Sequence, residues 1–200
     1  MNYKKNSTDL HKGYWENKYL KNSIGWDIGY VSTPLKEYFN QLTNKDLKIL
    51  IPGAGNSYEA EYLYRNGFIN IDVIDFALSP LQNIKERITT FPNEQLIQKD
   101  FFKHRKKYDL IVEQTFFCSL HPDNRLNYVK KIASLLEKKG KLIGLFFDFE
   151  LTSEGPPFGG SLKEYLQLFS EKFNIITIDK CYNSIKPRLG RELFFIFEKK

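Results

Sequence analysis

The stretch ILIPGAGNSYEA, residues 49–60, decides the expected fold. An apolar run typical of a buried strand ends at Gly53 and Gly55, and a helix is expected to begin directly after them. In such a unit the backbone N–H groups and the helix dipole point outward, toward a ligand. A dinucleotide fingerprint would have a third glycine where this chain has Tyr58. The loop therefore predicts a ligand site, but of a kind other than the usual dinucleotide one.

Strands and helices alternate along the rest of the chain. Apolar runs and turn residues predict strands at 47–52, 69–75, 96–99, 108–113, 141–147, 174–179 and 192–198, and helices at 58–66, 79–89, 123–138 and 161–172. This alternation predicts a parallel sheet, and the last two strands, with no room for a helix between them, must pair antiparallel. The expected α/β fold, with a mostly parallel seven-stranded sheet and a C-terminal antiparallel hairpin, resembles the Rossmann-like class I S-adenosylmethionine-dependent methyltransferase fold, which by itself is an analogy of fold.

Local signals also predict where helices begin and end. Residues 1–45 form an expected N-terminal extension, or lid, with a helix at 9–21 and a second helix that Thr33 caps. Ser79 and Ser161 each open an expected capping box, and Gly140 is expected to end the helix at 123–138. No repeat or linker composition interrupts the chain, so we expect one domain over residues 1–200.

Composition and charge are those of an ordinary globular protein. The chain is 42% hydrophobic and carries a net charge of +6, but its lysines are scattered, which favours a solvated surface over a nucleic-acid site. No apolar run reaches the roughly 20 residues of a membrane span, and no signal peptide is evident. We expect a cytoplasmic protein with reduced Cys118 and Cys181, no membrane or nucleic-acid partner and no metal. The histidines lack ligand spacing, and they are His11, His104 and His121.

Acidic residues at the ends of neighbouring strands indicate the ligand. Asp75 follows Gly53 by 22 residues and ends the second expected strand, where a carboxylate accepts hydrogen bonds from both ribose hydroxyls. Asp100 follows the third strand and is placed to bind an adenine amino group, with Phe101 or Phe102 over the ring face. This set favours an adenosine-containing cofactor. A plain glycine turn with a surface aspartate, and aromatic rings that only fill the core, are the alternatives.

Six motifs together resemble one known family. Trp15-x-x-x-Tyr19, GWDIGYVSTP (25–34), IPGAGNS (51–57), DFF (100–102), EQTFFCSLHP (113–122) and EGPPF (154–158) occur in this order. From about residue 15 onward they resemble the thiopurine S-methyltransferase family, and within it most closely the plant and bacterial halide/thiol methyltransferases. Many methyltransferase loops have an acid where this chain has Ile51, and that acid is absent from this family as well.

The resemblance implies a site for S-adenosylmethionine. The implied cofactor-binding residues are Trp15, Tyr19, Trp26, Gly53, Gly55, Asp75, Phe76, Asp100, Phe101 and Gln114. Among them, the aromatic residues Trp15, Tyr19 and Trp26 of the N-terminal extension would close over the cofactor. An indole face attracts a sulfonium cation by about 0.5–2 kcal/mol. Gln114 departs from the family pattern. Thiopurine enzymes have arginine there and halide/thiol enzymes often have tyrosine, so the acceptor stays open.

Transfer of a methyl group to a soft anion needs a dry, weakly polar pocket, since charge disappears along the reaction. The expected walls are Phe116, Phe117, Phe147, Phe149, Pro156, Pro157 and Phe158, of which Phe117, Pro157 and Phe158 are the principal substrate-pocket residues. No residue is assigned as a certain catalytic group, because in-line positioning suffices. His121 is an alternative base, and Cys118 is expected to pack beneath the site.

The predicted function is methyl transfer from S-adenosylmethionine to a small soft nucleophile: a thiol, hydrosulfide or halide. The first alternative is a thiopurine-type activity on aromatic thiols. Nucleic-acid methylation is a second alternative, prompted by the basic charge, although no NPPY-type tetrapeptide follows the fourth strand. A non-catalytic module that binds the cofactor is the third.

Overall fold

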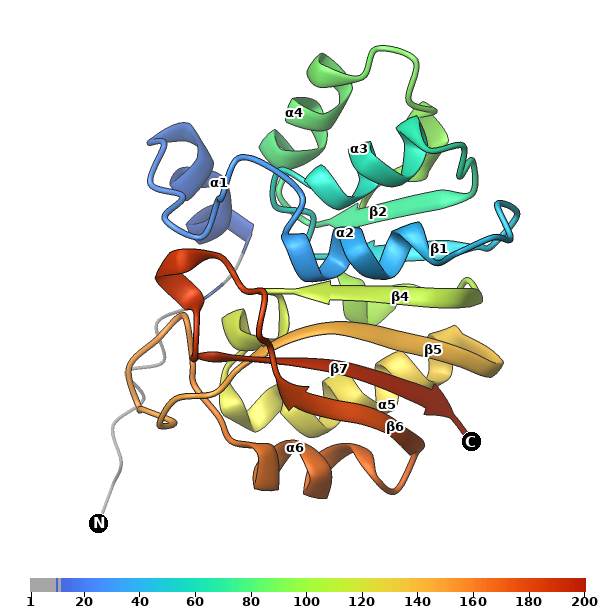
Figure 1. Ribbon diagram of the computed structural model, residues 1–200. Helices are drawn as coiled ribbons and strands as arrows, with labels where there is room; N and C mark the ends of the chain where they lie inside the picture. The colour runs from blue at the N-terminus through green and yellow to red at the C-terminus, as the bar shows by residue number, and fades with distance from the viewer. Residues whose placement is uncertain (1–9, 11) are drawn as a thin grey trace.

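The computed structural model describes residue 10 and residues 12–200. Its seven-stranded sheet has the order β3-β2-β1-β4-β5-β7-β6 (Figure 1). Neighbours from β3 to β5 are parallel, whereas β7 runs antiparallel between β5 and β6. The strands are β1 Ile49–Pro52, β2 Ile71–Asp75, β3 Leu96–Gln98, β4 Tyr108–Gln114, β5 Leu136–Phe147, β6 Phe173–Lys180 and β7 Glu192–Lys199. The mostly parallel sheet with its antiparallel hairpin is thus confirmed.

Helices cover both faces of this sheet. They are α1 Lys12–Leu20, α2 Thr33–Asn40, α3 Tyr58–Arg65, α4 Ser79–Arg87, α5 Arg125–Leu135 and α6 Leu162–Phe169. Alternate residues of a strand face opposite sides. Leu50 packs with residues of α5 and α6, whereas Ile49 and Ile51 pack with residues of α2, α3 and α4. Burial on both faces explains why β1 is an unbroken apolar run. The expected helix at 9–21 is α1, and its first residue and His11 lie outside the described residues.

Gly140 does not end a helix, so that expectation is wrong. Helix α5 ends at Leu135 and β5 begins directly after it. Tyr108 of β4 pairs with Leu136, but Leu110 already pairs with Lys141, so β5 bulges between these pairs. A Cβ atom on Gly140 would lie 3.0–3.2 Å from three backbone carbonyl oxygens. The glycine therefore lets the bulged segment pass close to β4.

Of the two expected capping boxes, one is confirmed and one is wrong. The Ser161 hydroxyl accepts a hydrogen bond from the Glu164 N–H at 3.3 Å, as a cap does. Ser79 instead lies inside the first turn of α4. The Glu16 carboxylate of α1 caps that helix, because it accepts hydrogen bonds from the Leu78 N–H at 2.7 Å and from the Ser79 hydroxyl. The cap thus comes from the N-terminal arm, defined here as the segment from α1 to Val31.

The start of α2 also differs by one residue from the expectation. Ser32, rather than Thr33, holds the N-cap position, and Pro34 lies in the first turn. The Ser32 hydroxyl does not cap the helix. It donates to the side-chain oxygen of Gln114 at 2.8 Å and so ties the end of the arm to β4.

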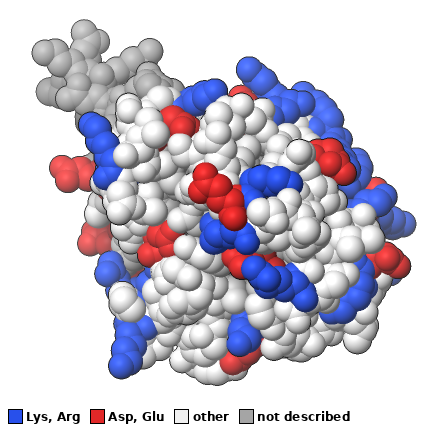
Figure 2. All heavy atoms as spheres, turned by 90° about the horizontal axis from the view of Figure 1, so that it is seen from above, with Lys and Arg blue, Asp and Glu red and all other residues white. Residues whose placement is uncertain are grey.

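Charged side chains are mixed in sign on the face that Figure 2 shows, where Lys and Arg groups alternate with Asp and Glu groups. In the centre of this face groups of opposite sign lie against one another, while Lys and Arg groups gather along its right edge with a few acidic groups among them. Among the described residues, no helix has the length and apolar character that crossing a membrane requires.

The Glu16 cap gives a stability prediction. Replacing Glu16 by Ala leaves the first N–H groups of α4 without their acceptor, and loss of such a cap costs about 1 kcal/mol. We expect Glu16→Ala to lower the free energy of unfolding in urea by that amount. Glu86→Ala, at an exposed position of the same helix, is the control and should change it by less than about 0.5 kcal/mol. Equal effects of the two variants would contradict the assigned cap.

Candidate active site

A cavity of about 1050 Å³ opens at the carboxyl ends of the parallel strands. Gly53 and Gly55 follow β1, Asp75 ends β2, Thr115 follows β4 and Phe147 ends β5, and all of them line it. The cavity therefore lies where the strand order reverses between β1 and β4, which is the usual ligand position in a doubly wound sheet. In Figure 1 the arrowheads of β2 and β4 point toward the side on which α1 lies.

Aromatic residues of the arm form one wall of the cavity. Trp15 and Trp26 meet edge to face with ring centroids 5.5 Å apart, and Tyr19 meets Trp26 in the same way at 5.8 Å. All three line the cavity, as the resemblance implies for residues that close over a cofactor. The arm is tied to the glycine loop, because the Asn56 amide donates to the Asp27 carboxylate.

The two glycines of the loop have different reasons to be glycine. Gly53 has a φ of +66°, and a Cβ atom there would lie 2.3 Å from the ring of Phe116. Gly55 has a φ of +52° but open space around it, so it keeps the backbone accessible to a ligand. Tyr58, which stands where a third glycine was missing, turns toward α4, where the Arg87 guanidinium lies 4.6 Å from its ring centroid.

The Asp75 carboxyl lies at the cavity, where β2 ends. Burial raises its pKa to about 6, although hydrogen bonds from backbone N–H groups, including that of Ala77 at 2.8 Å, oppose the shift. The group is therefore ionised above pH 6 and able to accept from two hydroxyls. Phe76, which follows it, also lines the cavity.

The segment after β3 supplies another part of the cavity wall. Asp100, Phe101 and Phe102 all line it. Asp100 accepts a hydrogen bond from the Phe102 N–H at 2.8 Å, which fixes the short turn that carries both rings. Phe101 meets Phe116 edge to face at 5.2 Å, so the turn after β3 packs against the loop after β4.

Of the thirteen residues expected to bind the cofactor or to form the principal substrate pocket, three lie outside the cavity lining, and so does the expected wall residue Phe149. Gln114 is engaged with Ser32, Phe117 packs in the core against Phe146 at 4.9 Å, and Phe158 is buried beside His121. Their contact with a ligand stays a prediction. The remaining ten expected site residues line the cavity, and they are Trp15, Tyr19, Trp26, Gly53, Gly55, Asp75, Phe76, Asp100, Phe101 and Pro157.

Two largely buried charged residues at or beside the cavity were not anticipated from the sequence. Arg188 lines it from the β6–β7 connection with a side chain only 11% exposed, donates to the Trp26 carbonyl at 2.7 Å and lies 3.5 Å from the Glu192 carboxylate. Glu113 is fully buried near the end of β4, and its carboxyl group accepts a hydrogen bond from the Phe116 N–H in the loop that follows. Only its position at a strand end could have drawn attention to Glu113, and nothing local distinguishes Arg188.

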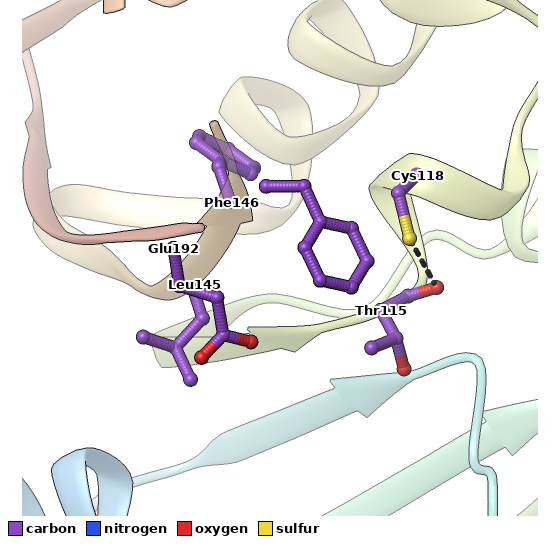
Figure 3. A pocket seen from close by; sticks show the side chains of 6 residues that line it. Thr115, Cys118, Leu145, Phe146 and Glu192 are labelled. Carbon is purple, nitrogen blue, oxygen red and sulfur yellow. Dashed lines mark hydrogen bonds between the residues drawn. The ribbon is translucent and has the colours of Figure 1, made fainter. Parts of the chain in front are cut away.

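Cys118 and His121 are the two residues near the cavity that could act as a nucleophile or a base. Burial raises the pKa of the Cys118 thiol, so it is a poor nucleophile. Figure 3 shows Cys118 donating to the Thr115 carbonyl at 3.3 Å beside a second pocket of about 10 Å³, which holds one water at most. His121 lines the large cavity with a half-exposed ring. The described residues contain no group of three His, Cys, Asp or Glu side chains that could hold a metal.

The fold is that of the class I S-adenosylmethionine-dependent methyltransferases. Solved structures with the same fold include magnesium protoporphyrin IX methyltransferase from Synechocystis with bound S-adenosylmethionine, at a TM-score of 0.74, 12% identity and full coverage of both chains. The 1,6-didemethyltoxoflavin-N1-methyltransferase of Burkholderia thailandensis, with bound S-adenosylhomocysteine, matches at a TM-score of 0.73 and 16% identity over 96% of this chain and 88% of the other.

Sequence comparison gives the family. The family model for "Thiopurine S-methyltransferase (TPMT)" matches residues 10–198, so the chain belongs to the thiopurine S-methyltransferase family. A "Probable thiol methyltransferase 2" of Arabidopsis thaliana is 27% identical over 90% of this chain and 82% of its own. "Thiocyanate methyltransferase 1" of Brassica oleracea is 26% identical over 92% and 83%, and "Thiopurine S-methyltransferase" of Acinetobacter baylyi is 24% identical over 81% and 85%.

The pKa of Asp75 gives a pH prediction. The folded carboxyl binds its proton more tightly than the unfolded one, so this group stabilises the fold at low pH, and that contribution is lost as the pH rises from about 4 to 6. The affinity for a cofactor whose ribose binds at Asp75 should instead increase with pH, because only the ionised carboxylate can accept hydrogen bonds from both ribose hydroxyls. We expect affinity for S-adenosylhomocysteine, measured by calorimetry, to rise as the pH rises to 6 and to level off above it.

Asp75→Asn isolates this group. At pH 8 it should weaken S-adenosylhomocysteine binding about 10- to 100-fold, because hydrogen bonds to a charged group contribute roughly 1.5–3 kcal/mol. The rise in affinity between pH 5 and 6 should also be lost. Asp179→Asn, at an exposed carboxylate of β6, is the control and should keep the normal profile. A normal profile in Asp75→Asn would show that another group titrates.

Proposed function

We propose that this methyltransferase uses a small, soft anion as its acceptor, namely a thiolate, hydrosulfide or halide. The observation that carries the proposal is the pairing of aromatic walls with the largely buried guanidinium of Arg188 in one cavity. The relatives with thiol and thiocyanate methyltransferase names support it, since the match spans 82–86% of their length.

The same cavity offers groups for each part of the cofactor. Asp75 would accept from the ribose hydroxyls, and Asp100 and Phe101 would meet the adenine. A Cβ atom on Gly55 would meet no neighbouring side chain or backbone within 4 Å, so a ligand can approach this backbone with its methionine part. The arm wall of Trp15, Tyr19 and Trp26 would face the sulfonium, where a ring face stabilises positive charge without offering a nucleophile.

Arg188 would hold the acceptor anion. Its guanidinium lies 5.7 Å from the ring centroid of Phe147, and the Trp26 carbonyl and the Glu192 carboxylate fix its orientation. A guanidinium is more weakly hydrated than an ammonium group and therefore suits a soft anion in a partly dry pocket. Phe116 and Pro157 line the same cavity and keep it weakly polar.

The reaction then depends on positioning. S-adenosylmethionine, when bound, supplies an electrophilic methyl group. A lone pair of the acceptor forms the new bond to the methyl carbon while the methyl–sulfur bond breaks and its electron pair stays on the sulfur. Holding the reactants in line accelerates such a step greatly, and an acceptor that is already an anion needs no base. For a protonated thiol, His121 at the cavity wall is the candidate base.

Methylation of aromatic thiols is the second candidate, because the cavity volume exceeds what small ions require. We expect neither a nucleic-acid acceptor nor a membrane partner, since the lysines are scattered along the sequence. Both cysteines are free and buried, which agrees with a cytoplasmic location.

An acceptor panel tests the proposal. Labelled cofactor is incubated with hydrosulfide, an aliphatic thiol, iodide, bromide and a thiopurine under one set of conditions. We expect turnover with hydrosulfide, the aliphatic thiol and iodide, and slower turnover with the thiopurine. A preference for the thiopurine would favour the aromatic-thiol alternative. Absence of turnover on every member of the panel would overturn the proposal.

Arg188→Gln tests how the acceptor is held. Removing the guanidinium should raise the KM for iodide about 10- to 100-fold, since a hydrogen bond to a charged group contributes about 1.5–3 kcal/mol. The KM for S-adenosylmethionine should change less than about threefold, a difference of about 0.7 kcal/mol, because Glu16 and Asp27 still hold the arm when the bond to Trp26 is lost. Arg191→Gln is the matched control, because Arg191 is exposed and its guanidinium lies over Phe149 at 4.7 Å. A change confined to the cofactor KM would assign Arg188 to the cofactor instead.

A further inference from the structure

The carboxyl group of Glu113 organises the segment that follows β4. Its side chain has no exposed surface. One oxygen accepts hydrogen bonds from the N–H groups of Phe116 and Phe117, both at 2.8 Å. The other accepts from the Tyr128 hydroxyl of α5 at 2.6 Å. Both oxygens are therefore engaged, two of the three donors being backbone groups of one turn.

The segment that Glu113 binds has an unfavourable backbone conformation. Thr115 has a φ of +60°, in the left-handed region that β-branched residues rarely occupy. A short 3-10 turn follows at Phe117–Ser119, and the first N–H groups of such a turn have no partner within it. The Glu113 carboxyl supplies that partner. It thus caps the turn and offsets the cost of the Thr115 conformation.

This turn carries parts of both sides of the cavity. The ring of Phe116 fills the space beside Gly53, where a Cβ atom would collide with it. The Cys118 carbonyl accepts a hydrogen bond from the Phe158 N–H at 2.8 Å, which attaches the loop that contains Pro157. A shift of the turn would therefore move the cofactor loop contact and the acceptor wall together.

Burying an ionisable carboxyl group at position 113 costs free energy that an apolar side chain filling the same part of the core would not cost. Burial raises the pKa of Glu113 to about 7, even though hydrogen bonds from Tyr128, Phe117 and Phe116 oppose the shift. Apolar side chains of similar volume often replace buried charged groups with no loss of stability. What an apolar residue cannot do is accept the two backbone hydrogen bonds of the turn.

We propose that Glu113 is a positioning residue for methyl transfer, whose carboxyl caps the 115–119 turn and so sets the distance between the cofactor loop and the acceptor wall. The proposal rests on the proposed function only for the identity of the acceptor. It assigns Glu113 no contact with either reactant. Its effect reaches the reaction through Phe116 on one side and the Pro157 loop on the other.

Three variants separate this role from simple core packing. Glu113→Leu keeps the volume but has no acceptor for the turn. Glu113→Gln keeps one acceptor oxygen for the two N–H groups and an amide that can donate to the Tyr128 hydroxyl. Tyr128→Phe is the matched control, because it removes a buried hydrogen bond to the same carboxyl but leaves both bonds to the turn.

The first readout is hydrogen exchange of peptides that cover residues 115–119, measured with S-adenosylhomocysteine bound. We expect exchange at least about tenfold faster in Glu113→Leu, equivalent to about 1.4 kcal/mol, and near-normal exchange in Glu113→Gln and Tyr128→Phe. This measurement needs no acceptor, so it stands even if the acceptor panel fails. Normal exchange in Glu113→Leu would overturn the proposal.

The second readout is turnover on whichever acceptor the panel identifies. In Glu113→Leu, kcat should fall about 10- to 100-fold, because small displacements of positioned groups can cost this much. Glu113→Gln should restore kcat to within about threefold, and Tyr128→Phe should leave it there too. An equal loss in Tyr128→Phe and Glu113→Leu would mean a general core role. If Glu113→Leu does not fold, Glu113→Asp, which is one methylene too short to reach both N–H groups, replaces it with the same expected and overturning results.

Discussion

The close approach between Gly53 and the ring of Phe116 is the constraint on which the site depends. It joins the loop after β1 to the loop after β4, the two segments on either side of the point where the strand order reverses. No side chain larger than hydrogen fits at position 53 unless the ring moves. The ring in turn stays in place because Glu113 holds the backbone at Phe116. The cavity at the carboxyl ends of the strands therefore depends on a fixed distance between the loop after β1 and the loop after β4.

The arm completes the cavity through polar contacts rather than through a large apolar interface. Its helix α1 has no buried residue, and it is held by Glu16 at the start of α4, by Asp27 at Asn56 and by Trp26 at Arg188. Of these partners Arg188 lines the cavity itself, whereas Asn56 and Leu78, the N-cap residue of α4, lie within two residues of Gly55 and Phe76, which line it. Such an attachment opens at a lower free energy than the sheet, which suits a segment that must admit a ligand.

The fold could be predicted from the sequence because its signals are local. Apolar runs, glycines and the short connection before β7 are sufficient to specify strands, helices and the antiparallel end of the sheet. The errors occurred where a distant partner decides the structure. Ser79 resembles a cap, but the true cap is Glu16, 63 residues away. Gly140 resembles a helix stop, but its position is set by how β5 pairs with β4.

The same distinction applies to the site. Asp75, Trp26 and the glycine pair follow motifs with fixed spacing, and the structure brings them to one cavity. Arg188 and Glu113 could not be identified in this way, because a charged residue becomes significant only when the fold buries it. Gln114 bonds to Ser32, a contact between distant parts of the chain that no local signal indicates, and its contact with a ligand stays a prediction.

The tie between Trp26 and Arg188 also has a consequence for how the molecule is made. Arg188 lies in the connection to β7, the strand that pairs with both β5 and β6. A growing polypeptide on the ribosome has its aromatic arm from the outset, but the guanidinium that anchors it and the strand beside it emerge more than 150 residues later. The complete cavity therefore forms only after the segment that contains Arg188 has been synthesised.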